Sequence, residues 1–134
     1  MNVRERIGKF LEAEAFGVAG ASTNREKFGN KVLRCYLENG KRVIGINPRA
    51  TEIEGAPCVA TVADLPPEVK SLSVITPPAI TEQVVAEAIA RGIENIWMQP
   101  GAQSPRAIAA CEEHGINVIA DGTCILVVLG YHDH

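Results

Sequence analysis

The sequence predicts an α/β fold with a doubly wound, mostly parallel sheet that carries helices on both faces. Stretches with helical character end at Gly40, Gly92 and Gly115, and each is followed within a few residues by a short apolar run. Glycine suits a helix end because it enters the left-handed region without a Cβ clash. The runs are continuously apolar, as in strands buried on both faces. Strands that alternate with helices imply parallel pairing through right-handed crossovers.

Six short runs are expected to form strands: residues 16–19, 43–46, 58–60, 72–75, 95–98 and 117–120. The apolar stripe in residues 7–14 predicts a leading helix, and residues 81–91 predict a later one with one apolar face. Ser104 before Pro105 marks another helix start, since serine caps and proline fits the first helical position. Residues 23–26 have the spacing of a capping box but are equally compatible with a loop.

Length and composition narrow the class of protein. The 134 residues are predicted to form one domain over 1–134, with 46% hydrophobic and 22% charged residues, as in ordinary globular proteins. A net charge of −3 and an aromatic content of 4% disfavour nucleic-acid binding. No apolar run approaches the ~20 residues of a membrane span, and the first residues do not resemble a signal peptide. We therefore expect a cytoplasmic protein with no membrane association.

The cysteines and histidines indicate neither a disulfide framework nor a metal site. The four cysteines form no C-x-x-C pair, and no histidine lies at zinc-finger spacing, so reduced thiols are expected. His132 and His134 are the remaining candidates for metal ligands, but chain ends are commonly frayed. The sequence therefore predicts no bound metal.

Polar, glycine-rich or proline-rich segments follow five of the predicted strands. Turns between strands and helices need such residues in any case, so each segment alone is weak evidence. Together, however, they would form one rim, because ligands of doubly wound sheets bind outside the carboxyl ends of the strands. The segments are residues 20–24, 47–49, 76–78, 99–102 and 121–124.

The first segment is compatible with a phosphate site. Gly20 follows a buried strand directly, and a helix is expected to open near Gly29, so backbone N–H groups could receive a phosphate. Lys27 or Lys31 could add positive charge. The dinucleotide fingerprint G-x-G-x-x-G is nevertheless not met, because Gly17 and Gly20 have the wrong spacing.

The second segment bears on which nucleotide would bind. NAD-binding folds usually carry an acidic residue here to hold the ribose hydroxyls, whereas this chain has Asn47, Pro48 and Arg49. An arginine attracts a phosphorylated ribose, which leaves NADP or coenzyme A. A solvated arginine in a proline turn explains the same residues equally well.

Several short motifs follow one another along the chain. They are Gly20-Ala21-Ser22, Lys27-Phe28-Gly29-Asn30, Asn47-Pro48, Glu52-Ile53-Glu54-Gly55, Pro77-Pro78, Trp97-Met98-Gln99-Pro100-Gly101-Ala102 and Cys124. Taken in order, they resemble those of the small stand-alone CoA-binding domain proteins. They are also similar to the amino-terminal CoA-binding domain of the succinyl-CoA synthetase alpha subunit. The likeness runs from about Phe16 to Val127.

This resemblance implies a Rossmann-like fold that binds coenzyme A. It places the loop at residues 20–22 and the Asn30 region at the diphosphate, residues 47–49 near the adenosine and its phosphate, residues 76–78 in the pocket wall, and residues 99–101 along the pantetheine. Many relatives have a basic residue before the last-strand cysteine, where this chain has Thr123, so a family role for that cysteine is in doubt here. With the candidates named above, the expected contacts are Gly20, Ala21, Ser22, Lys27, Asn30, Asn47, Pro48, Arg49, Thr76, Pro77, Pro78, Gln99, Pro100 and Cys124.

No catalytic residues are expected. His114 sits at a predicted helix end, where a cation suits the dipole, and Ser22 has no evident base. Asp121 fits a turn better than a catalytic base. Cys124 is a candidate reactive thiol or a buried packing residue.

The sequence therefore predicts a domain that binds coenzyme A or acyl-CoA without catalysis of its own, in a sensing, carrier or regulatory role. One alternative is a small NADP-binding or redox-sensing protein. Another is a subunit of a CoA ligase. Such a subunit would be active only with a partner chain, because 134 residues are too few to contain the ligase's other domains. A pure interaction module is a further alternative, which would need Trp97 and Phe28 to form an exposed patch.

Overall fold

The computed structural model describes residues 1–131. His132 and His134, considered above as metal ligands, lie outside the described residues. The elements follow the chain as α1 (Val3–Leu11), β1 (Ala15–Ala19), α2 (Phe28–Glu38), β2 (Arg42–Ile46), β3 (Glu52–Ile53), β4 (Ala56–Val59), the 3-10 turn η1 (Val62–Asp64), β5 (Val69–Val74), α3 (Pro78–Arg91), β6 (Asn95–Met98), α4 (Pro105–Glu113), β7 (Asn117–Ile119) and α5 (Ile125–Leu129).

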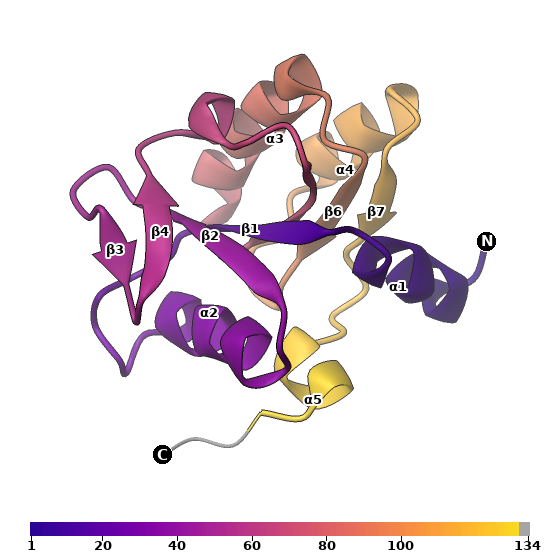
Figure 1. Ribbon diagram of the computed structural model, residues 1–134. Coiled ribbons are helices and arrows are strands. Elements are labelled where there is room, and N and C mark those ends of the chain that lie inside the picture. The colour runs from indigo at the N-terminus through magenta and orange to yellow at the C-terminus, as the bar shows by residue number, and fades with distance from the viewer. Residues whose placement is uncertain (132–134) are drawn as a thin grey trace.

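The strands form one seven-stranded sheet in the order β3-β4-β2-β1-β5-β6-β7 (Figure 1). All neighbouring pairs are parallel except β3 and β4. From β1 the chain winds outward through β2 to β4, and it then returns to the other side of β1 and continues through β5, β6 and β7. The predicted doubly wound, mostly parallel sheet is confirmed, and its switch point lies between β1 and β5.

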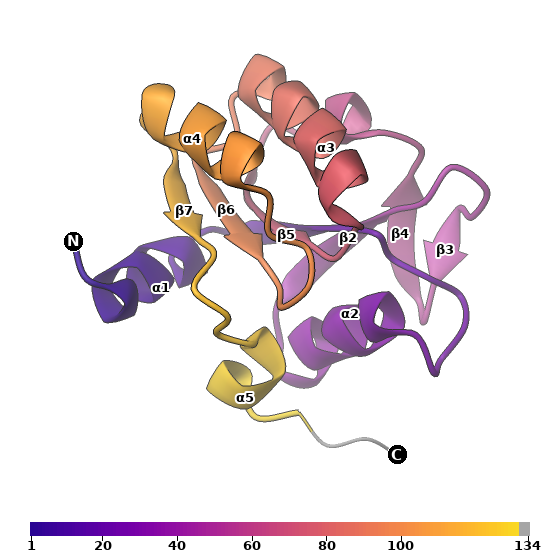
Figure 2. The same ribbon diagram turned by 180° about the vertical axis from the view of Figure 1, so that it is seen from behind.

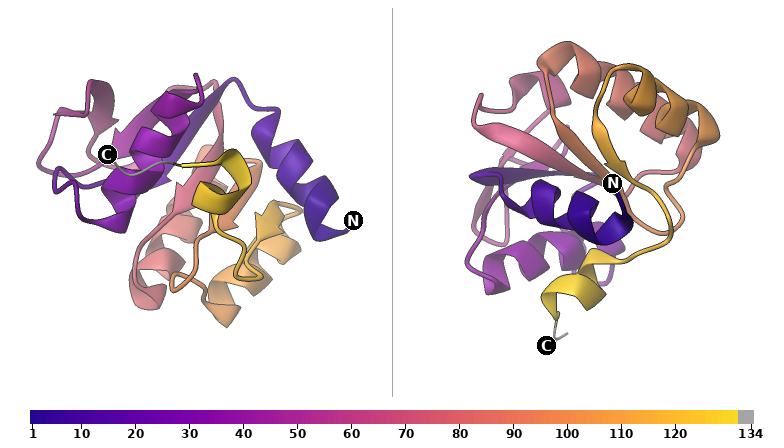
Figure 3. Two further views of the ribbon diagram at one scale, coloured as in Figure 1. Left: turned by 90° about the horizontal axis from the view of Figure 1, so that it is seen from below. Right: turned by 90° about the vertical axis from the view of Figure 1, so that its right-hand side faces the viewer.

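Helices cover both faces of the sheet. Helices α3 and α4 lie on one face, and α1, α2 and α5 lie on the other, as the views from behind and from the side show (Figures 2 and 3). Each face has its own apolar core. Strand β1 is buried along its whole length, as its unbroken apolar run predicts. Trp97 is fully buried among the aromatic side chains of Phe10 and Phe16, so it is a core residue and not part of an exposed patch.

Three local features differ from the sequence-based expectation. The leading helix ends at Leu11, so Glu14, at the end of the 7–14 stripe, is wrongly placed in it; the chain must become extended there to enter β1 at Ala15. The hairpin of β3 and β4 was not expected, because a two-residue strand is too short to show periodicity. Helix α5 was missed for the same reason. Residues 23–26 form a loop, and α2 begins only at Phe28.

A ladder of buried polar side chains fastens α1 to the sheet. Ser71, Asn95 and Asn117 are register partners on β5, β6 and β7. Asn95 Nδ2 donates to Ser71 Oγ over 3.1 Å, and Asn117 Nδ2 donates to Asn95 Oδ1 over 3.0 Å. The two ends of the ladder donate to main-chain carbonyls of α1, at Phe10 and Arg6. Asn95 is therefore the link that joins the ladder.

We expect Asn95→Ala to lower the free energy of unfolding by about 1–3 kcal/mol, because it removes partners from two buried polar groups at once. Urea denaturation measures the change. The control is Gln83→Ala on the exposed side of α3, which should stay within about 0.5 kcal/mol of the wild type. Equal effects of the two substitutions would contradict a stabilising role for the ladder.

Candidate functional site

The strand register brings the predicted rim segments to one edge of the sheet. Ala19, the last residue of β1, is level with Ile46 on β2 and with Val74 on β5. Val74 is in turn level with Met98 on β6. The residues after these four strands therefore leave the sheet side by side. The prediction that the polar segments share the carboxyl-terminal edge is confirmed.

A crevice of about 270 Å³ opens at this edge, beside the switch point. Four of the predicted site residues line it, namely Gly20, Ala21, Pro48 and Thr76. Its other walls are mainly apolar and come from the ends of β1 and β2, from η1 and the two residues before it, and from α3. The remaining lining residues are Ala19, Ile46, Ala60, Thr61, Val62, Ile80, Val84 and Glu87. Such a slot suits the flat, weakly polar part of a nucleotide.

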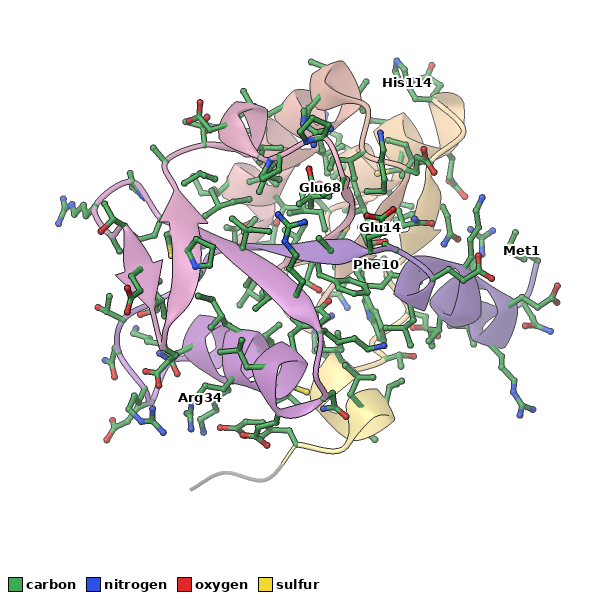
Figure 4. All side chains as sticks on the ribbon, in the orientation of Figure 1. Met1, Phe10, Glu14, Arg34, Glu68 and His114 are labelled. Carbon is green, nitrogen blue, oxygen red and sulfur yellow. The ribbon has the colours of Figure 1, made fainter. Side chains whose placement is uncertain are left out.

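A hollow of about 320 Å³ lies at the opposite edge, but its charge does not suit an anionic ligand. Its wall contains Glu12, Glu14, Glu68 and Glu94, against two lysines. Glu14 and Glu68 are labelled in Figure 4. Excess negative charge repels phosphate groups, so the carboxyl-terminal edge is the better candidate site.

The loop after β1 packs unusually close to α2. Gly20 has a φ of 95°, and a Cβ built on Gly29 would lie 2.0 Å from the carbonyl oxygen of Gly20. Only glycine at position 29 permits this approach. No side chain caps α2, whose cap position is Lys27, and its first turn carries no acidic residue. The first N–H groups of the helix are thus free of a capping side chain and lie next to the loop.

The side chain of Asn30, on α2, fixes the backbone of this loop by hydrogen bonds. Asn30 is fully buried, and its Nδ2 donates to the carbonyl oxygen of Ser22 over 2.8 Å and to Glu54 Oε2 over 3.3 Å. Its Oδ1 accepts a 2.7 Å bond from Arg34 Nε. Because these bonds engage both ends of the amide, the side chain of Asn30 positions the loop and is not exposed at the rim.

Sequence reasoning did not assign roles to Glu54 and Arg34, two of the partners of Asn30. Glu54 stands in the turn between β3 and β4 with a φ of 52°, and it forms an ion pair with Arg25 in the loop. The hydrogen bond from Asn30 holds the pKa of the Glu54 carboxyl below its usual value, and the charge of Arg25 acts in the same direction. The sequence signal that could have revealed the turn is the Glu54-Gly55 pair, because a glycine-containing pair can adopt the positive φ values that close a tight hairpin.

Asn47 makes a second connection between rim segments. Its Nδ2 donates to the carbonyl oxygen of Ala21 over 3.0 Å, and its Oδ1 accepts bonds from the N–H groups of Arg49 and Ala50. The amide therefore ties the loop after β1 to the loop after β2. Like Asn30, it shapes the backbone of the site.

The two predicted basic residues are exposed at this edge. Neither Arg49 nor Lys27 has a side-chain hydrogen bond or ion pair with any residue in the range 1–131. Because no protein group in that range neutralises these two charges, both remain available to an anionic ligand. At the next strand, the Thr76 hydroxyl bonds with that of Thr81 over 2.8 Å. Pro77 and Pro78 are exposed at the start of α3, outside the lining of the crevice.

The last candidates lie farther along the edge, at β6 and after β7. Gln99 is fully buried, and its Oε1 accepts the N–H of Ile125 over 3.0 Å, while its Nε2 has no hydrogen-bond partner among residues 1–131. Trp97 Nε1 donates to the carbonyl oxygen of Thr123 over 2.9 Å. These two bonds hold Cys124, the half-buried cap residue of α5, between them. Pro100 is exposed after β6.

The four cysteines are free thiols and differ in exposure. Burial raises the pKa of Cys35 to about 11 and that of Cys111 to about 11. Burial also raises the pKa of Cys58. A raised pKa leaves little thiolate, so Cys35 and Cys111, which are also inaccessible, are poor nucleophiles.

The groups considered for catalysis have structural partners. Ser22 Oγ accepts the N–H of Asn24, and Asp121 Oδ1 accepts the N–H of Thr123. Hydrogen bonds from Thr123, from its side chain first and then from its N–H, lower the pKa of Asp121. His114 caps α4, with its Nδ1 2.9 Å from the carbonyl oxygen of Ala110. Within residues 1–131, no three His, Cys, Asp or Glu side chains gather as metal ligands, and no helix has the length and apolar character to cross a membrane.

Comparison with known proteins links the chain to coenzyme A. The model of a family described as "CoA binding domain" matches residues 14–130. A conserved hypothetical protein from Pyrococcus furiosus has a solved structure that is 36% identical, with a TM-score of 0.81, over 86% of this chain and 98% of that one. A solved protein from Thermus thermophilus is 31% identical, with a TM-score of 0.83, over 95% and 96% of the two chains.

Curated relatives include much longer enzymes. Acetate–CoA ligase (ADP-forming) I of Archaeoglobus fulgidus is 29% identical over 112 residues, which are 76% of this chain and 16% of the ligase. The chain spans less than a fifth of the length of the curated ligases that it matches.

Proposed function

Because the chain belongs to the family of CoA-binding domains, we propose that it binds coenzyme A or an acyl-CoA at the carboxyl-terminal edge of the sheet. The observation that carries this proposal is the family match over residues 14–130, which includes every segment of the rim. The crevice beside the switch point and the unpaired cations at the same edge support it.

Each predicted contact has a role in this proposal. The adenosine lies in the crevice with Gly20, Ala21, Pro48 and Thr76, and the diphosphate meets the loop after β1 and the start of α2. Arg49 binds the phosphate on the ribose, and Lys27 adds charge near the diphosphate. The pantetheine arm runs toward β6 and β7. Ser22 belongs to the loop at the diphosphate, and Pro77 and Pro78 follow Thr76 at the pocket wall. Gln99, Pro100 and Cys124 are the contacts farther along the pantetheine. Asn30 and Asn47 act through the backbone that they hold.

Native mass spectrometry of freshly purified protein, followed by calorimetry with coenzyme A, NADP and NAD, tests the ligand. We expect a retained mass that fits coenzyme A or an acyl-CoA, and tighter binding of coenzyme A than of either dinucleotide. Equal or tighter binding of NADP would replace this proposal with an NADP-binding one.

A second candidate function is that of a ligase component, which the named ligases among its relatives favour. The first candidate function is different, because there the domain binds its ligand for sensing, transport or regulation and catalyses nothing alone.

For this first candidate, acetyl-CoA, ADP and phosphate incubated with the chain should give no ATP. ATP formation by the chain alone would contradict the non-catalytic role.

We expect Cys124 to be the first cysteine labelled by CoA disulfide. Its thiolate would attack one sulfur of that disulfide, form a mixed disulfide with one coenzyme A and release the other as a thiolate. Cys124 is half-buried at the rim, whereas Cys35 and Cys111 are fully buried with raised pKa values. Peptide mapping over time identifies the labelled site, with Cys124→Ser as control. First labelling at Cys58, or none, would make Cys124 a packing residue.

A further inference from the structure

A buried arginine lies under the loop that the proposed diphosphate site uses. Arg34 is on α2, one turn after Asn30, and only 6% of it is exposed. Its Nε donates to Asn30 Oδ1 over 2.7 Å, and its Nη2 donates to the carbonyl oxygen of Arg25 over 2.8 Å. One guanidinium thus holds the loop at Arg25 and orients the amide that holds it at Ser22.

The same guanidinium contacts the end of the described chain. Its Cζ lies 5.5 Å from the centre of the Tyr131 ring. The main-chain N–H of Tyr131 donates to the carbonyl oxygen of Leu126 over 2.9 Å, so the backbone that carries the ring is fastened to α5. Figure 4 shows Arg34 at the lower side of α2, next to the C-terminal segment. An aromatic face over a guanidinium attracts its charge and restricts its orientation.

We propose that Arg34 and Tyr131 act together as positioning residues for the ligand loop, residues 20–27. Tyr131 restrains the guanidinium plane, and Arg34 then fixes Asn30 and the Arg25 carbonyl. The inference rests on the proposed function and adds to it a control of the site by the C-terminal segment. The docked segment 125–131 and the order of the loop that receives the ligand are thereby coupled.

The chemistry of arginine explains why this position is more than packing. Asn30 Oδ1 and the Arg25 carbonyl are two separate acceptors, which one planar fork of N–H donors satisfies together. A lysine would keep the charge and much of the apolar stem but could not reproduce this pair of directed bonds. Arg34→Lys therefore separates orientation from charge.

The test compares four variants with the wild type by two measurements. Amide hydrogen exchange of residues 21–30 is followed without ligand, and the Kd for coenzyme A is measured by calorimetry. The variants are Tyr131→Ala, Tyr131→Phe, Arg34→Lys and, as a control, Val127→Ala, whose side chain is 80% exposed on α5. Urea midpoints report global stability, so that a local effect on the loop can be recognised.

We expect faster exchange in residues 21–30 and about three- to tenfold weaker coenzyme A binding in Tyr131→Ala and Arg34→Lys. Tyr131→Phe, which retains the ring, and Val127→Ala should behave like the wild type. Unchanged exchange in both Tyr131→Ala and Arg34→Lys would overturn the inference, even if coenzyme A binds. An equal loss in Tyr131→Phe would overturn the role of the ring. If exchange changes as expected but the wild type binds no coenzyme A, the positioning pair stands and the proposed function fails.

Discussion

Replacing Gly29 by alanine is expected to lower the free energy of unfolding by about 1–3 kcal/mol and to weaken coenzyme A binding by about tenfold or more. The added Cβ would lie 2.0 Å from the Gly20 carbonyl oxygen, and the nearest atoms are all backbone atoms of Gly20 and Ala21, so no flexible side chain can move aside. Either the loop or α2 must shift, and both belong to the proposed diphosphate site. Urea denaturation and calorimetry measure the two effects.

Gly8→Ala is the matched control, because a Cβ at that exposed position of α1 meets nothing within 4 Å. Alanine should stabilise the helix there by about 0.5–1 kcal/mol and leave ligand binding unchanged. If Gly29→Ala proves as harmless as Gly8→Ala, the close approach of α2 to the loop does not shape the site. A loss of stability with full affinity would place the phosphates elsewhere.

Arg49→Ala is expected to weaken the binding of coenzyme A about tenfold and that of dephospho-CoA far less. A hydrogen bond between charged groups contributes about 1.5–3 kcal/mol, and the exposure of Arg49 favours the lower end of that range. Dephospho-CoA lacks only the phosphate on the ribose, so the difference between the two ligands isolates this contact. Calorimetry with both ligands gives the comparison.

Arg4→Ala, which removes an exposed arginine from α1, controls for the loss of overall charge. It should leave both affinities within about twofold of the wild type. An equal loss of the two ligands in Arg49→Ala would show that Arg49 does not read that phosphate. Lys27 would then be tested by the same pair of ligands.

Most of the sheet could be predicted from the sequence because its strands are buried on both faces. The run at 95–98 matches β6 in full, and the runs at 16–19 and 43–46 each lack one residue of β1 and β2. Parallel pairing then fixes which strand ends share an edge, so the rim could also be predicted. The register that makes the segments adjacent is a direct consequence of this topology.

The direction of individual side chains at the rim could not be predicted in the same way. Asn30 and Asn47 occupy the expected segments, but their amides point into the protein and bond to Ser22 and Ala21. Those partners come from another part of the chain, and no periodicity encodes them. Glu54 reaches the loop only because a short hairpin folds back toward α2, which is a tertiary effect.

Three separate elements secure the loop after β1: α2 through Asn30, the β2 loop through Asn47, and the β3–β4 hairpin through Glu54. Ordering a mobile loop and its side chains during association costs about 0.5–1.5 kcal/mol for each side chain immobilised. In this protein the cost is met when the chain folds, before any ligand arrives. Binding should therefore carry a small conformational entropy penalty, and the loop should keep the same backbone conformation with and without ligand.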